Sequence, residues 1–132
     1  MKNTRILLPG GAGLVGQNLV ARLKERGYTD IVVLDKHPSN LAILSQMHPD
    51  ITAVQCDLSQ PGDWLHYFDG ASSVVMLQAQ IGGLHYEEFE ANNILATKLI
   101  LQAVKDYGVP YLVHVSSSVV ESVADDFYTR SK

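Results

Sequence analysis

The chain has 132 residues, of which 46% are hydrophobic and 18% charged, with a net charge of −4 and a single cysteine, Cys56. This length fits one globular domain, the weakly acidic charge disfavours nucleic acid as a partner, and one cysteine excludes a disulfide framework. The amino-terminal apolar run is too short for a secretory signal, and no run approaches the length of a membrane span. We therefore expect a cytoplasmic protein without a membrane partner.

Short apolar runs alternate with amphipathic segments along the chain. The runs predicted as strands are Arg5–Leu8, Asp30–Leu34, Ile51–Gln55, Ser72–Leu77 and Tyr111–Val115. The segments predicted as helical are Gly13–Arg26, residues 39–47, a turn within Ser59–Phe68, Tyr86–Tyr107, and a last helix that opens at Ser122–Asp125. In the first helix, Val15, Leu19, Val20 and Leu23 are predicted to face the core. Nearly continuous apolar strands separated by helices indicate an α/β fold, a doubly wound parallel sheet of Rossmann type with about five strands.

The stretch LPGGAGLVG, residues 8–16, places Gly10, Gly11, Gly13 and Gly16 between the first predicted strand and the first predicted helix. Glycines there permit a tight turn, close approach of the backbone to a pyrophosphate, and close packing of the helix on the strand. Free N–H groups at the start of the helix then bind the phosphates. The pattern predicts a dinucleotide site, and the alternative is an ordinary strand–helix turn.

Asp35 follows the glycines by about 20 residues and stands at the end of the second predicted strand. A carboxylate there accepts hydrogen bonds from ribose hydroxyls and repels a 2′-phosphate, which favours NAD over NADP. The neighbouring Lys36 weakens this preference, because a cation tolerates the phosphate. The alternative is that Asp35 is a solvated loop acid.

Further motifs follow in chain order. They are PGGAGLVG at 9–16, Asp57-Leu58, VVMLQAQ at 74–80, ANNILATKLILQAV at 91–104, LVHVSSSVVE at 112–121 and YTRSK at 128–132. Together they resemble the extended short-chain dehydrogenase/reductase family, the NAD-dependent epimerase/dehydratase group that acts on nucleotide sugars. The resemblance implies that NAD is bound by Gly10, Gly13, Leu14, Val15, Gly16, Asp35, Asp57, Leu58, Leu77, Gln78, Ala79 and Asn93. The chain departs from the family pattern at Pro9, before the glycines, and at Gln78 and Gln80, which replace smaller residues in the loop facing the nicotinamide side.

Tyr128 and Lys132 lie four residues apart, so a helix would bring them to one face. A nearby ammonium and the positive nicotinamide favour the phenolate form of a tyrosine, whose ordinary pKa is about 10. The resemblance implies that Tyr128 exchanges a proton with a substrate hydroxyl or carbonyl while hydride moves to or from the nicotinamide. It also implies that Lys132 binds the nicotinamide ribose and that Ser117, or alternatively Ser118, holds the substrate oxygen.

The histidines show no metal-ligand spacing, so no metal is predicted, and Cys56 is expected to be a buried structural thiol. Family members continue well beyond the position of Lys132. We therefore expect residues 1–132 to form one NAD(P)-binding domain without a second, substrate-binding domain, as a piece of a longer protein that turns over poorly by itself. Exposed apolar surface is expected beside the fourth and fifth strands, and a homodimer would cover it.

Two functions remain open. The first is an NAD-dependent oxidoreductase, epimerase or dehydratase acting on a nucleotide sugar or a similar small molecule. The second is a non-catalytic dinucleotide-binding module, which would have no need of Tyr128, Lys132 and Ser117. A steroid- or flavonoid-type reductase of the same extended family would prefer NADP, and Asp35 counts against it.

Overall fold

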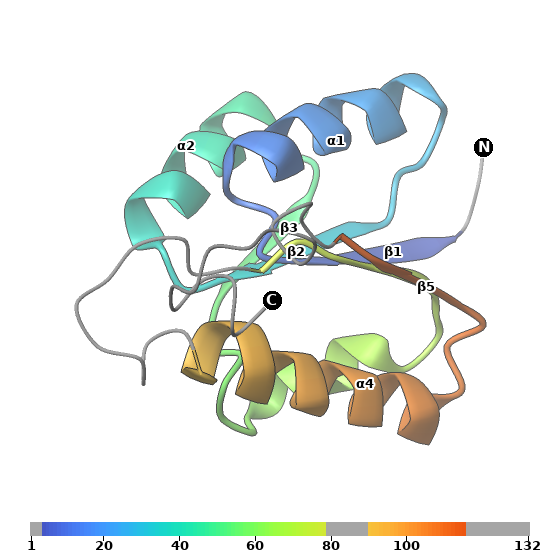
Figure 1. Cartoon of the computed structure of the whole chain (residues 1–132). Coiled ribbons are helices and arrows are strands. Elements are labelled where there is room, and N and C mark those ends of the chain that lie inside the picture. Colours follow the sequence, from blue (N-terminus) through green and yellow to red (C-terminus); the bar gives the residue numbers. More distant parts are fainter. Residues whose placement is uncertain (1–3, 79–89, 116–132) are drawn as a thin grey trace, which may run out of the picture.

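The computed structural model describes residues 4–78 and 90–115. Five parallel strands form one sheet in the order β3-β2-β1-β4-β5 (Figure 1). They are β1 (Arg5–Pro9), β2 (Ile31–Asp35), β3 (Thr52–Gln55), β4 (Ala71–Met76) and β5 (Tyr111–His114). The first strand lies in the centre, where Ile6 pairs with Ile31 of β2 and Arg5 pairs with Ala71 of β4. This order is that of a doubly wound Rossmann-type sheet, so the predicted fold class is confirmed.

Helices cover both faces of the sheet, which explains why β2 is apolar almost throughout. On one face lie α1 (Leu14–Glu25) and α2 (Pro38–Met47), and on the other lie the 3₁₀-helix η1 (Asp63–Phe68) and α4 (Ala96–Tyr107) (Figure 1). A π-helical turn, η2 (Glu90–Leu95), leads directly into α4, so the described part of the predicted helix Tyr86–Tyr107 begins irregularly. No helix in the described ranges is long and apolar enough to cross a membrane.

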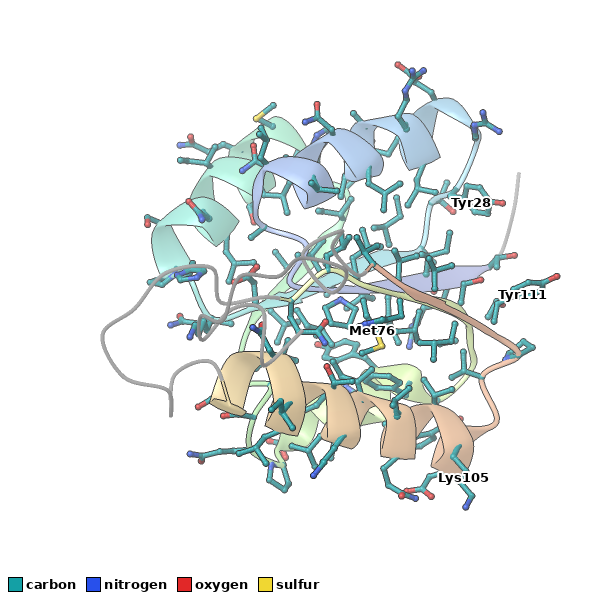
Figure 2. The ribbon with its side chains drawn as sticks, in the orientation of Figure 1. Tyr28, Met76, Lys105 and Tyr111 are labelled. Atoms are coloured by element: carbon teal, nitrogen blue, oxygen red, sulfur yellow. The ribbon has the colours of Figure 1, made fainter. Side chains whose placement is uncertain are left out.

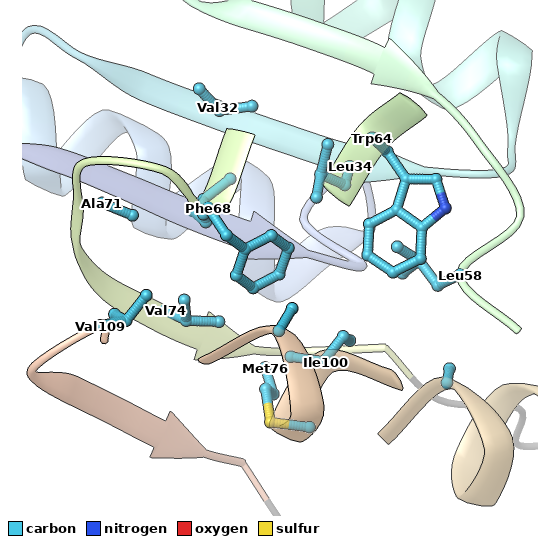
Figure 3. Close-up of a cluster of buried hydrophobic side chains, with 13 residues drawn as sticks. Val32, Leu34, Leu58, Trp64, Phe68, Ala71, Val74, Met76, Ile100 and Val109 are labelled. Atoms are coloured by element: carbon cyan, nitrogen blue, oxygen red, sulfur yellow. The ribbon is translucent and has the colours of Figure 1, made fainter. Parts of the chain in front are cut away.

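Each face of the sheet has its own apolar cluster, because successive strand residues point to opposite faces. Leu8 packs beneath α1 and α2, whereas its neighbour Leu7 belongs to the cluster beneath α4. In this second cluster, the rings of Trp64 and Phe68 stand with their centroids 6.0 Å apart (Figure 3). Met76 lies between the sheet and α4, as Figure 2 shows. These two clusters pack the helices against both faces of the sheet.

Two expectations about apolar side chains have different outcomes. Val15 was predicted to face the core, which is wrong: its side chain is 61% exposed, because the first turn of α1 lies beside a cavity at the end of the sheet. Val20, five residues further along α1, is fully buried as predicted. The apolar surface expected beside the fifth strand is present, with Tyr111 71% exposed and Val113 also exposed on β5 (Figure 2).

Candidate dinucleotide-binding site

The turn that follows β1 packs closely against two other parts of the backbone. Gly10 has a φ of 76°, and a Cβ built on it would lie 2.3 Å from the backbone nitrogen of Gln78, just beyond β4. A Cβ on Gly16 would lie 2.0 Å from the carbonyl oxygen of Gly11. Real Cβ atoms do not approach backbone atoms this closely. Gly10 and Gly16 are therefore required by the packing of β4 and α1 against the turn.

Gly13 has a different environment. It is the N-cap residue of α1, and no side chain caps this helix. The nearest heavy atom to a Cβ at Gly13 would be the carbonyl oxygen of Gly10, 4.0 Å away, so the space beside it is open. The first N–H groups of a helix have no partner within the helix, and the helix dipole adds positive potential there. An uncapped helix start facing open space fits a phosphate group.

Asp35, the last residue of β2, is hydrogen-bonded to the glycine turn. Its side chain is only 5% exposed, so the alternative of a solvated loop acid is wrong. The backbone N–H of Ala12 donates to Oδ2 at 3.0 Å, and the backbone N–H of His37 donates to Oδ1 at 3.1 Å. Each carboxylate oxygen can accept a further hydrogen bond. Asp35 thus ties the glycine turn to the end of β2 and retains acceptor capacity for a ribose hydroxyl.

These groups line a cavity of about 470 Å³ at the carboxyl edge of the sheet. The predicted cofactor-binding residues that line it are Gly10, Gly13, Leu14, Val15, Gly16, Asp35, Leu58, Leu77 and Gln78. The cavity lies where the strand order reverses, since β2 and β4 flank β1 on opposite sides. In open α/β sheets this is the position at which ligands bind, and the volume is typical of small-molecule sites.

The structure also brings to the cavity residues that sequence reasoning did not assign to the cofactor. They are His37, Asn40, Cys56 and Ala96. Lys36, whose positive charge bears on the choice between NAD and NADP, also lines the cavity. His37 and Asn40 come from the start of α2, and Ala96 from the start of α4. The signal that could have found His37 and Asn40 is their place just after the carboxyl end of β2, the same edge that carries Asp35.

Other predicted site residues do not line the cavity or are outside the described ranges. Asp57 is exposed, and the N–H and hydroxyl of Ser59 donate to its Oδ1 at 3.0 and 2.6 Å, which lowers the pKa of the Asp57 carboxyl. Asn93 is buried in η2, just before α4. Neither is among the described residues that line the cavity. Ala79, Ser117, Tyr128 and Lys132 are outside the described residues, so their roles stay predictions.

Cys56 is half-buried rather than fully buried, and it faces the cavity just after β3. Burial, reinforced by the charges of Asp35 and Asp57, raises the pKa of its thiol from 9.0 to about 12. At pH 8 we expect iodoacetamide to alkylate the folded chain about 1,000-fold more slowly than the urea-unfolded chain, because the thiolate is the reactive form. Mass spectrometry measures both rates on the single cysteine.

The same shift predicts how stability depends on pH. The Cys56 thiol ionises in the unfolded chain near its ordinary pKa of 9.0 and in the folded chain only near 12. Its contribution to the free energy of unfolding is therefore complete below pH 9 and is lost as the pH rises toward 12. Equal alkylation rates in buffer and in urea would contradict both expectations.

Comparison with known proteins gives matches over nearly the whole chain. Residues 6–129 match the family described as NAD dependent epimerase/dehydratase. A 3-beta-hydroxysteroid dehydrogenase from Mycolicibacterium neoaurum is 32% identical over 124 residues, which cover 88% of this chain and 32% of that protein. The chain spans about a third of the length of the curated relatives that it matches.

Solved structures agree with the fold. Uronate dehydrogenase from Agrobacterium tumefaciens superposes with a TM-score of 0.72 at 25% identity, covering 86% of this chain and 41% of that one. The UDP-glucuronic acid 4-epimerase from Bacillus cereus, in complex with NAD, superposes with a TM-score of 0.80 at 23% identity, covering 97% of this chain and 48% of that one.

Proposed function

Because the chain belongs to the NAD-dependent epimerase/dehydratase family, we propose that it is the cofactor-binding part of an enzyme acting on a hydroxyl or carbonyl group of a nucleotide sugar. The family match confirms the predicted family resemblance and the predicted cofactor, NAD. The observation that carries the proposal is the cavity, in which the glycine turn, the uncapped start of α1 and Asp35 meet. Within the enzyme, NAD supplies the site that accepts or returns a hydride.

Different residues of the cavity bind different parts of NAD. The backbone around Gly13 receives the pyrophosphate, because the space there is open and the helix start is positive. The Asp35 carboxylate accepts hydrogen bonds from hydroxyls of the adenosine ribose and repels a 2′-phosphate. Leu14 and Val15, both exposed in the first turn of α1, provide apolar contact. Tyr128 and Lys132 complete the proposal as the proton-transfer pair, with Ser117 on the substrate oxygen.

The substrate class is the second part of the proposal. The names of the structural relatives, a uronate dehydrogenase and a UDP-glucuronic acid 4-epimerase, support a sugar-type substrate. A steroid is the second candidate, since the 3-beta-hydroxysteroid dehydrogenase relative has the higher identity, 32%. On the basis of the sequence, we also propose a cytoplasmic location. The exposed apolar residues on β5 support a homodimer that covers them.

Calorimetric titration with NAD and, separately, NADP tests the proposal. We expect NAD to bind much more tightly than NADP, because the Asp35 carboxylate repels a 2′-phosphate. Absence of binding to the folded chain would contradict the cofactor site. Mixing the NAD-loaded chain with UDP-glucuronic acid or with a 3-beta-hydroxysteroid, and following NADH absorbance, then separates the two substrate classes. Formation of NADH with one of them would assign the substrate class and contradict a non-catalytic module.

A further inference from the structure

Gln78 stands just beyond β4 and is held by only one end of its side-chain amide. Its Nε2 donates to the Thr97 hydroxyl of α4 at 3.2 Å, and that hydroxyl donates to the main-chain oxygen of Asn93 at 2.7 Å. The other polar atom of the amide, Oε1, is buried and has no hydrogen-bond partner among the described residues. Buried acceptors in folded proteins nearly always have a donor, so this one calls for an explanation.

The order of the strands decides which part of a dinucleotide meets Gln78. Along the carboxyl edge, Asp35 ends β2, the glycine turn follows β1, and Gln78 follows β4, with β1 between the other two strands. Asp35 receives the adenosine ribose and the turn receives the pyrophosphate. Gln78 also lines the cavity and touches the turn, as its backbone lies against Gly10. The half of the dinucleotide beyond the pyrophosphate therefore lies on the side of Gln78.

The chemistry of that half narrows the contact to one kind of group. A pyrophosphate offers only acceptors, whereas the hydroxyls of the second ribose are donors. The bond to Thr97 commits Nε2, so Oε1 is the atom left to bind a ligand. The second ribose is also the first donor-bearing group after the pyrophosphate.

We propose that Gln78 is a cofactor-binding residue whose Oε1 accepts a hydrogen bond from a hydroxyl of the nicotinamide-side ribose. Thr97 is the positioning residue that holds the amide in place. The inference rests on the proposed function only in requiring that NAD occupies the cavity.

Calorimetric titration of the full chain with NAD, ADP-ribose and ADP tests this contact. Gln78→Met keeps the length of the side chain and removes both polar atoms. We expect this substitution to weaken the binding of NAD and of ADP-ribose about tenfold, as for one lost hydrogen bond. The affinity for ADP should stay unchanged, because ADP lacks the second ribose. Thr97→Val should weaken NAD binding by a similar factor. Thr97→Ser, which keeps the hydroxyl, should leave the NAD affinity unchanged. Gln102→Met, the same substitution on the exposed side of α4, is the matched control and should change none of the affinities.

The possible results separate this inference from the proposed function. Unchanged NAD affinity in Gln78→Met, with an unchanged melting temperature, would overturn the inference and leave the NAD site intact. Equal weakening of ADP and NAD would also overturn it, since the effect would then lie at the pyrophosphate or in the fold. Failure of the unsubstituted chain to bind NAD would contradict the proposed function and this inference together.

Discussion

Replacing Gly16 with alanine is expected to abolish measurable NAD binding and to lower the free energy of unfolding by about 3 kcal/mol. The added Cβ would lie 2.0 Å from the carbonyl oxygen of Gly11 and 2.3 Å from its carbonyl carbon. Both are backbone atoms, so no side chain can rotate away to make room. The start of α1 must therefore move off the turn, which opens the phosphate site. Urea denaturation and calorimetric titration measure the two effects.

Gly13→Ala is the matched comparison, because it adds the same methyl group three residues earlier. Its Cβ would meet nothing closer than the carbonyl oxygen of Gly10 at 4.0 Å, so we expect stability to change by about 1 kcal/mol or less. NAD affinity should still fall, since the methyl group occupies the space proposed for a phosphate. A Gly16→Ala chain as stable as the unsubstituted one would contradict the close packing of α1 on the turn.

Asp35→Asn is expected to weaken NAD binding about 10- to 100-fold and to narrow the preference for NAD over NADP. The N–H groups of Ala12 and His37 both donate to the carboxylate, one to each oxygen. An asparagine offers one oxygen and one NH₂ group, so one backbone N–H would face another donor. The turn then loses one of its ties to β2, and the charge that repels a 2′-phosphate is gone. Titration with both cofactors measures the change.

Asp106→Asn removes the same charge at the exposed end of α4, where the carboxylate accepts only from Gln102 among the hydrogen bonds found for it. This control should bind both cofactors as the unsubstituted chain does. An Asp35→Asn chain that kept the original ratio of NAD to NADP affinity would show that Asp35 does not set the choice of cofactor.

Much of the fold is predictable because local signals and the tertiary structure agree. The apolar run before Asp35 becomes β2, a strand buried along its whole length, and the glycines after β1 become the turn that the sheet requires. Residues that follow each strand of a parallel sheet meet at its carboxyl edge, so Leu58, Leu77 and Gln78, for which the motifs predict cofactor contact, line the cavity there.

The remaining features depend on contacts that periodicity does not report. Val15 has the spacing of a core residue, but it lies in the first turn of α1, beside the cavity rather than over the sheet. Asp57 follows β3 as the motif suggests, yet it is exposed with its Oδ1 bonded to Ser59, and its neighbours Cys56 and Leu58 line the cavity instead. The burial of Asp35 likewise follows from two backbone donors that only the folded turn brings together.

The place of β1 in the sheet has a consequence for the order in which this protein folds. The strand β1 is synthesised well before its neighbour β4, so Arg5 pairs with Ala71 across most of the described chain. Pairings between residues so far apart in sequence form late, because a long loop must close first. Gly10 takes its close packing from Leu77 and Gln78, which follow β4. During synthesis on the ribosome, the glycine turn is therefore made long before the backbone of Leu77 and Gln78 against which it packs. The dinucleotide cavity is complete only after β4 has joined the sheet.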